Sequence, residues 1–224
     1  MTPTLHLTSE RTLLIRFSGG MSLSNQQRVE SLMRILLRWD SNLIRNLHPA
    51  YASLLVEFDP SQMSMKNFVE KIQDVLNVTQ MEPRSSFREL NVPVFYHGED
   101  LEALSIELSL SPTQIIQLHC SVVYTVFFLG FQPGFPYLGE LPLALRVPRL
   151  STPRTQVSAG SVAIAGMQTG IYPRDSAGGW RILGKTPIAL FTPNENPPTT
   201  FQMGDRVKFF PIDEVEFNSF QGGK

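Results

Sequence analysis

The sequence has little of several features that mark particular classes of protein. It contains a single cysteine, Cys120, so an intramolecular disulfide framework cannot form and no cysteine pair is present for a zinc site. Charged residues make up 17% of the chain, below the usual ~25%. The formal net charge is -1, so there is no basic excess of the kind that binds nucleic acid.

Long hydrophobic runs are also absent. The longest apolar stretch, 122–130, is interrupted by Tyr124 and Thr125 and is far shorter than the ~20 residues of a membrane-spanning helix. Residues 1–16 lack a basic start followed by a long apolar run, so we expect no signal peptide. With 42% hydrophobic residues the chain is not disordered. We therefore expect a soluble cytoplasmic protein with no nucleic-acid or membrane partner.

The N-terminal part has the pattern of a small α+β domain. A strand at 11–17 precedes an amphipathic helix capped by Ser22 or Ser24, whose apolar side chains recur at helical spacing: Val29, Leu32, Met33 and Leu36. The rest of the pattern consists of strands at 43–47 and 53–58, a helix containing 65–76 and an extended segment at 87–94. The order β-α-β-β-α-β is typical of a ferredoxin-like domain. The polar segment 82–86 is the expected linker, which gives domains at 1–84 and 85–224.

The second part begins with two short helices and continues with strands. Asp100 can cap a helix at 101–108, and Ser111-Pro112-Thr113-Gln114 has the residues of a capping box for a helix ending near His119. Short β-rich runs separated by Gly and Pro predict a barrel or sandwich: 122–129, 161–165, 170–172, 180–183, 188–191 and 206–210. The fold class is therefore α+β. The long turn-rich stretch 130–158 is of the kind that is usually functional or covered by a partner.

One match to a nucleotide-binding motif is not supported by the residues around it. Residues 179–186 fit the phosphate-loop pattern G-x-x-x-x-G-K-[ST]. A phosphate loop needs a flexible glycine loop that leads into a helix N-terminus. The middle of this match prefers a strand, and Thr186 is followed by Pro187 and a second strand-like run. We therefore predict a strand, a turn at Gly184 and another strand.

The candidates for proton transfer and nucleophilic chemistry are few. The chain has four histidines, and none pairs as H-x-x-x-H or lies in an Asp/Glu/Cys cluster, so we expect no metal site. His119 at a helix end is either a packed histidine or a catalytic acid or base. Cys120 is expected to be buried and inert, because a nucleophilic cysteine needs exposure and a basic neighbour.

The turn-rich stretch contains the better binding candidates. Arg149 and Arg154 each follow a proline, and two arginines in a stiff loop can bind a carboxylate or phosphate through paired N–H donors. The alternative is that they are surface arginines paired with local acids. Aromatic residues concentrate around Pro133-Gly134; most should lie in the core, and the others are candidates for a partner-binding surface: Phe127, Phe128, Phe131, Phe135 and Tyr137.

Several long motifs resemble a bacterial family. They are FLGFQPGFPYL at 128–138, PR at 148–149 and 153–154, VSAGSVAIAG at 157–166, QTGIYP at 168–173 and GGW at 178–180. Together they resemble the family of 5-oxoprolinase B subunits, also called the KipI or allophanate hydrolase subunit 1 family. The chain departs from the family pattern at Ala177, where a proline usually precedes Gly-Gly-Trp.

The resemblance implies both a fold and a function. It implies a cyclophilin-like β-barrel in the C-terminal domain, behind the N-terminal α+β domain. It also implies two partners, the C and A subunits of 5-oxoprolinase, with which the chain forms an ATP-dependent enzyme that opens 5-oxo-L-proline to L-glutamate. A KipI-like member instead inhibits a sensor histidine kinase and has no chemistry of its own. In this context Gln168 and Tyr172 join Arg149 and Arg154 as candidate substrate- or anion-binding residues, and Trp180 joins Phe131, Phe135 and Tyr137 as partner-binding candidates.

Overall fold

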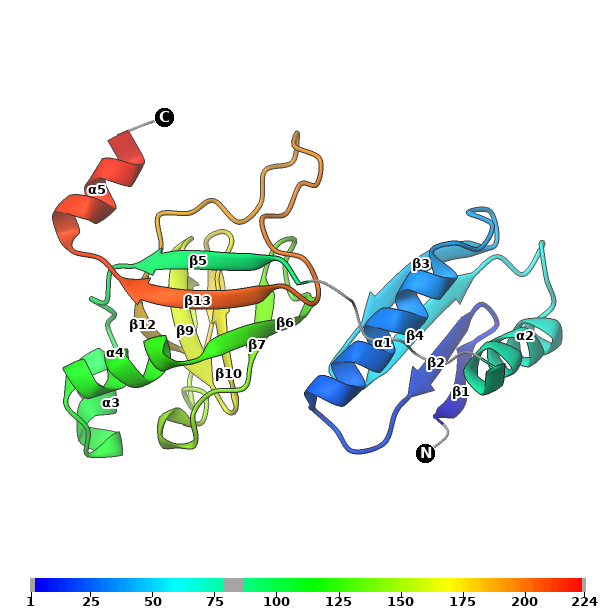
Figure 1. The fold of residues 1–224 in the computed structure, drawn as a ribbon, viewed down its shortest axis with the longest axis horizontal. Helices are drawn as coiled ribbons and strands as arrows, with labels where there is room; N and C mark the ends of the chain where they lie inside the picture. The colour runs from blue at the N-terminus through cyan, green and yellow to red at the C-terminus, as the bar shows by residue number, and fades with distance from the viewer. Residues whose placement is uncertain (1–2, 79–86, 223–224) are drawn as a thin grey trace. The chain divides into compact units, whose positions relative to one another are not determined.

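The computed structural model describes residues 3–78 and 87–222, which belong to two compact units, 1–86 and 87–224 (Figure 1). The expected domain boundary after residue 84 and the expected linker 82–86 lie outside the described residues. Each unit combines helices with a β-sheet of its own, as the α+β class requires. In the described part of the chain no helix is both long and apolar enough to cross a membrane.

The first unit is a four-stranded antiparallel sheet with the order β1-β2-β4-β3 and two helices. Its elements are β1 (Thr4–Ser9), β2 (Thr12–Arg16), α1 (Leu23–Leu36), β3 (Ile44–Pro49), β4 (Ser53–Phe58) and α2 (Met65–Val78). Alternate residues of β2 and β4 are buried: Leu13, Ile15, Leu54 and Val56. Ser22 caps α1 by accepting a hydrogen bond from the Asn25 N–H, and Phe68 of α2 stacks on Phe58 at 4.2 Å.

The order of the first sheet corrects one expectation from the sequence. The segment 87–94 is extended, as predicted, and forms β5 (Glu89–Val94). The β-α-β-β-α-β pattern requires it to join the first sheet, but it pairs in parallel with β13 (Arg206–Pro211) of the second unit. The unpredicted strand β1 instead occupies the edge beside β2. The reason is burial: Val92 and Val94 are enclosed in the second core, whereas most of β1 is exposed and has a weak apolar pattern.

The second unit is a curled sheet of seven strands in the order β12-β9-β10-β7-β6-β13-β5 (Figure 1). Its remaining strands are β6 (Val123–Leu129), β7 (Pro136–Gly139), β9 (Ser161–Ala165), β10 (Gln168–Ile171) and β12 (Arg181–Lys185). Phe95, just after β5, bridges to Lys185 at the end of β12, so the two edges of the sheet meet at that point. A separate two-stranded sheet joins β8 (Arg154–Val157) to β11 (Ser176–Gly178). The curled sheet agrees with the expected barrel.

The two helices that the sequence predicts in this unit are confirmed as α3 (Leu101–Leu108) and α4 (Pro112–Ser121). The short 3-10 helix η1 (Leu143–Leu145) and α5 (Glu214–Gly222) are not predicted by the sequence patterns. The capping box at Ser111 and Gln114 is confirmed. Asp100 lies at the N-cap of α3, but its side chain makes no capping hydrogen bond.

Two strand predictions are wrong. Residues 188–191 form no strand, and the pairing there is an isolated bridge from Phe191 to Thr199. Gly184 lies inside β12 and is not a turn. A Cβ atom on Gly184 would be 2.4 Å from the Phe95 carbonyl oxygen, so the glycine permits close packing between β12 and the chain after β5.

His119 lies in the core of the second unit with no exposed surface. Its ring packs against Phe209 with the centroids 4.6 Å apart. Nδ1 is 2.7 Å from the Tyr96 hydroxyl, and Nε2 is 3.0 Å from the Thr169 hydroxyl. Because Thr169 donates to the Ala163 carbonyl, it accepts from Nε2–H, which leaves Nδ1 to accept from Tyr96. The network therefore fits a neutral imidazole.

This burial makes stability depend on pH. Burial lowers the pKa of His119 to about 3, whereas an unfolded histidine has a pKa of ~6.5. The unfolded chain thus binds a proton that the folded chain excludes. The contribution of His119 to the free energy of unfolding is therefore complete above pH ~6.5. It falls by about 1.4 kcal/mol per pH unit as the pH drops toward ~3.

We expect the wild type to lose about 2 kcal/mol more of its unfolding free energy between pH 7 and 5 than His119→Gln, which cannot titrate. Urea unfolding at a series of pH values measures the difference. Nitrogen NMR of the histidine rings is an independent check, because His119 should remain the neutral Nε2–H tautomer at pH 5. Equal pH dependence in both proteins, or a protonated His119 ring at pH 5, would contradict this prediction.

Candidate functional site

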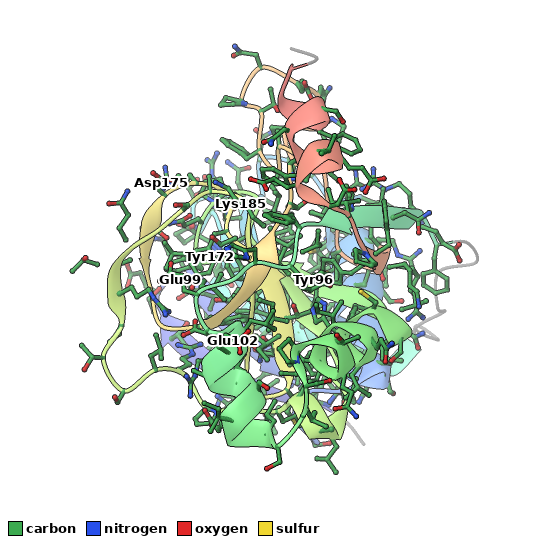
Figure 2. The ribbon with its side chains drawn as sticks, turned by 90° about the vertical axis from the view of Figure 1, so that its left-hand side faces the viewer. Tyr96, Glu99, Glu102, Tyr172, Asp175 and Lys185 are labelled. Atoms are coloured by element: carbon green, nitrogen blue, oxygen red, sulfur yellow. The ribbon has the colours of Figure 1, made fainter. Side chains whose placement is uncertain are left out.

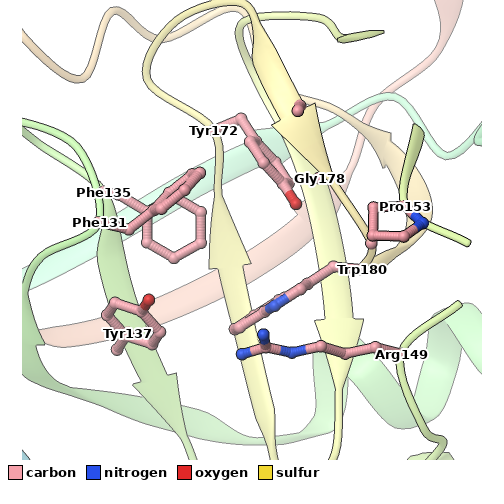
Figure 3. A pocket seen from close by; sticks show the side chains of 10 residues that line it. Phe131, Phe135, Tyr137, Arg149, Pro153, Tyr172, Gly178 and Trp180 are labelled. Atoms are coloured by element: carbon pink, nitrogen blue, oxygen red, sulfur yellow. The ribbon is translucent and has the colours of Figure 1, made fainter. Parts of the chain in front are cut away.

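A pocket of about 200 Å³ in the second unit is lined on one side by aromatic rings of the curled sheet and its loops (Figure 3). The opposite side is formed by the β8–β11 sheet and the segments next to it, namely residues 149–157 and 176–179, which we call the outer wall. The outer wall contributes Arg149, Pro153, Ala177, Gly178 and Gly179 to the lining. The sheet side contributes Phe131, Phe135, Tyr137, Tyr172 and Trp180.

The aromatic rings form a packed box around Phe135. Its ring is nearly perpendicular to Tyr172 at 5.3 Å and to Trp180 at 5.5 Å between centroids. Tyr137 lies 4.9 Å from Phe135 and 5.9 Å from Trp180. Edge-to-face contacts of this kind place the positive edge of one ring against the negative face of another. The sheet side of the pocket is therefore rigid and apolar.

Phe131 differs from the other rings because it is 60% exposed at the rim of the pocket. Its backbone has φ 67°, which is uncommon for a residue with a side chain. The ring still contacts Phe135 edge-on at 5.5 Å. Such an exposed aromatic residue beside a pocket is typical of a contact point for a partner.

Arg149 is the cation of the pocket. Its guanidinium carbon lies 5.8 Å from the centroid of Trp180 (Figure 3). Its loop is fixed by the hydrogen bond that the Leu150 N–H donates to the Gly179 carbonyl at 2.7 Å. Arg149 is exposed, and no carboxylate of the described residues forms an ion pair with it. The guanidinium can therefore receive an anion from outside the chain.

Two phenols add polar groups to the apolar box. Burial raises the pKa of Tyr137 and of Tyr172, and the nearby Arg149 charge opposes both shifts. Both phenols are therefore protonated at neutral pH and can donate hydrogen bonds. The Tyr172 oxygen accepts a hydrogen bond from the Trp180 backbone, which also opposes the rise in its pKa.

Arg154 is not among the residues that line the pocket. Its Nη2 lies 2.7 Å from Asp100 Oδ1, and its Nε lies 3.2 Å from Glu99 Oε2. The hydrogen bond with Asp100 raises the pKa of Arg154 above its usual value. Only Nη1, which is buried, has no acceptor within the described part of the chain. The structure therefore supports the interpretation of Arg154 as an arginine paired with local acids.

The structure brings together six of the residues that the sequence proposes and leaves three elsewhere. Those in the pocket are Phe131, Phe135, Tyr137, Arg149, Tyr172 and Trp180. Besides Arg154, Gln168 lies elsewhere: it begins β10 and pairs with Gly139 and Ala165. His119 is enclosed in the core network, which gives it no access to a substrate, so we propose no catalytic role for it.

The sequence motifs contain or adjoin the lining residues Pro153, Ala177, Gly178 and Gly179, but none of them was proposed as a site residue. The signal for the glycines was present in the Gly-Gly-Trp motif. A Cβ atom on Gly178 would be 2.3 Å from the Tyr172 hydroxyl oxygen, so only glycine lets the outer wall come this close to the ring.

The structure also places the residues of the phosphate-loop match. Most of the match forms the strand β12, so its backbone N–H groups lie in the sheet and do not surround a phosphate. The described ranges contain no cluster of three or more His, Cys, Asp and Glu residues that could hold a metal ion.

Comparison with known proteins gives the class. The family model described as carboxyltransferase domain, subdomain C and D, matches residues 3–201, and the chain belongs to this family. Within it, the chain is 38% identical over 190 residues to the 5-oxoprolinase B subunit of Bacillus subtilis, covering 77% of this chain and 78% of the relative. It is 36% identical over 213 residues to the 5-oxoprolinase B subunit of Escherichia coli O157:H7, covering 93% and 96%. These matches confirm the family resemblance of the sequence motifs.

A solved structure supports the fold. The crystal structure of TTHA0988 superposes on 91% of this chain with a TM-score of 0.82 and 38% identity. The present chain spans 40% of the length of that chain.

The close packing at Gly178 gives a prediction. We expect Gly178→Ala to lower the free energy of unfolding by about 1–3 kcal/mol, because its methyl group must displace the Tyr172 ring. Gly179→Ala is the matched control, since its Cβ would be no closer than 3.6 Å to the surrounding atoms, and its effect should stay within about 0.5 kcal/mol. Urea unfolding measures both, and equal stability of the two variants would contradict the prediction.

Proposed function

We propose that the chain is the B subunit of a bacterial ATP-dependent 5-oxoprolinase, which opens 5-oxo-L-proline to L-glutamate together with the C and A subunits. The curated relatives named as 5-oxoprolinase B subunits support this assignment. One observation carries the chemistry: a small aromatic pocket of about 200 Å³ has an arginine without an intramolecular ion pair among the described residues.

The pocket suits a small ring that bears a carboxylate. The guanidinium of Arg149 can bind a carboxylate through two parallel N–H donors. The flat faces of Trp180, Tyr137 and Phe135 provide apolar surface for the ring. The neutral Tyr172 hydroxyl, held by the Trp180 backbone, provides a donor for a carbonyl oxygen. 5-Oxo-L-proline has each of these parts: a carboxylate, a five-membered ring and a lactam carbonyl.

Opening the lactam requires activation. An amide bond in a five-membered ring is stable, and transfer of the ATP γ-phosphoryl group to its oxygen activates the ring carbon toward water. The tetrahedral adduct expels the ring nitrogen, which takes up a proton, and a second water hydrolyses the resulting acyl phosphate to glutamate and phosphate. N–H or O–H donors aimed at the oxygens of the adduct stabilise the charge that develops there. We assign ATP to the complex as a whole, because most of the phosphate-loop match forms the strand β12 and provides no phosphate-binding loop.

The rim of the pocket suits a protein partner. Phe131 is 60% exposed beside a pocket that opens to solvent, and its ring would be buried by a docked partner. We propose that Phe131 contacts the C subunit directly. This contact is supported by the rings packed behind Phe131. Phe135 packs directly against Phe131, and Tyr137 and Trp180 pack against Phe135.

The complex, and not the single chain, should carry the activity. We expect no glutamate from the purified chain with ATP and 5-oxo-L-proline, and ATP-dependent glutamate release once the C and A subunits are added. The reason is that the residues lining the pocket include no nucleophile–base pair. Coupled measurement of glutamate and ADP tests this. Glutamate formation by the single chain, or by the C and A subunits without it, would contradict the proposal.

Arg149 should be needed for turnover by the complex. Loss of a charge-assisted contact that is buried in the complex costs about 2–5 kcal/mol, so we expect Arg149→Ala to lower kcat/KM about tenfold or more. Arg149→Lys should restore little, because lysine lacks the paired donors.

The melting temperature is the folding control, and it should not change, because Arg149 is exposed and makes no ion pair among the described residues. Arg174→Ala is the matched surface control and should leave kcat/KM unchanged. Normal kcat/KM in Arg149→Ala would show that the guanidinium does not bind the substrate.

A further inference from the structure

We propose that the ion pair between Arg154 and Asp100 is a positioning element that fixes the outer wall, and with it Arg149, against the pocket. The effect on turnover rests on the proposed function. The role of the ion pair in fixing the outer wall depends on this chain alone. Arg154 thereby acts on the site through Arg149 and does not itself bind substrate.

Asp100 is hydrogen-bonded to the curled sheet and to α3. Its Oδ2 accepts the Ile182 N–H of β12 at 2.7 Å, and its backbone carbonyl accepts the Leu104 N–H of α3 at 2.8 Å. The Asp100 side chain is 6% exposed. Asp100 is therefore held by both β12 and α3, and its Oδ1 presents a fixed charge toward the outer wall.

Arg154 belongs to the outer wall. It is the first residue of β8, and its register partner in β11 is Gly178, which lines the pocket. Its side chain is 22% exposed and reaches Asp100 Oδ1 at 2.7 Å. The same ion pair therefore connects the pocket-lining strand β11, through β8, to β12 and α3.

The outer wall has a second anchor at the other end of β8. Val157, at the far end of β8, is buried with Phe135, Tyr172 and Trp180 in an apolar cluster. Pro153 and Arg149 come before β8 and are not part of that cluster. The segment that carries Arg149 is thus held on both sides. Before it, Val147 is buried in the core and its carbonyl accepts the Gly166 N–H at 2.6 Å; after it, Arg154 is the next anchor, and the Leu150–Gly179 hydrogen bond ties the segment to the residue after β11.

Glu99 contributes less than Asp100. Its side chain is 68% exposed, and its contact with Arg154 Nε is 3.2 Å. Figure 2 shows Glu99 near the start of α3. A solvated carboxylate adds little to an ion pair, which makes Glu99→Gln a suitable control.

The experiment uses the fluorescence of Trp180 to report whether the outer wall stays packed against the pocket. The chain has two tryptophans, so Trp39→Phe leaves Trp180 as the only one. Trp180 is 5% exposed, and acrylamide should quench its fluorescence weakly. In this background Arg154→Ala should increase quenching several-fold and accelerate hydrogen exchange of the Leu150 amide about tenfold or more, because one partner of a buried pair is lost.

Three further variants test the pair itself. Asp100→Asn keeps an oxygen for the Ile182 N–H but loses the charge, and it should reproduce the effect of Arg154→Ala. The two changes combined should be no worse than one, since both remove the same interaction. Arg154→Lys should restore part of the slow exchange, and Glu99→Gln should leave quenching and exchange unchanged.

Turnover by the reconstituted complex separates positioning from direct binding. If Arg154 acts through Arg149, Arg154→Ala lowers kcat/KM, and the Arg149→Ala/Arg154→Ala double variant is no worse than Arg149→Ala alone. Unchanged quenching and exchange in Arg154→Ala overturn the proposal, whatever the turnover. The quenching and exchange measurements need no partner protein or substrate, so failure of the proposed 5-oxoprolinase function leaves their outcome interpretable.

Discussion

The meeting of the two sheet edges in the second unit is the constraint on which the site depends. Phe95 and Lys185 exchange two backbone hydrogen bonds of 2.9 Å, and Gly98 donates to the Leu183 carbonyl at 3.1 Å. The backbones are so close that a Cβ atom on Gly98 would be 2.2 Å from the Ile182 carbonyl oxygen. This contact brings the start of α3 beside β12. Asp100 consequently lies where it can bind both the Ile182 amide and the outer wall.

The pocket itself combines a rigid apolar side with a polar side held at a few points. On the sheet side, perpendicular rings around Phe135 fill space and leave little freedom for any one of them. On the other side, the position of Arg149 depends on backbone hydrogen bonds and on the ion pair of a neighbouring residue. A charged group that must meet a ligand anion cannot be neutralised by its own chain, so its position has to be set by indirect contacts.

Much of the fold was predictable from sequence because its signals are local. The capping box at Ser111 and the strand at 53–58 need only neighbouring residues, and both were placed correctly. The place of β5 was not predictable, because strand pairing over more than a hundred residues leaves no local pattern. The pocket aromatics were found through their concentration and the family motifs. The pairing of Arg154 with an acid was one of two alternatives, and the sequence could not choose between them or name Asp100, since a proline-arginine loop gives the same pattern whether its anion is a ligand or a distant aspartate.

The hairpin of β1 and β2 has a consequence for the whole chain. Because β1 fills the edge that β5 was expected to take, the four strands of the first sheet all come from residues 4–58. The strands of the second unit come from residues 89–211, so neither sheet borrows a strand from the other. In topological terms the chain passes from one unit to the other once. Each unit can therefore acquire its sheet as a separate folding event, without waiting for long-range pairing with the other.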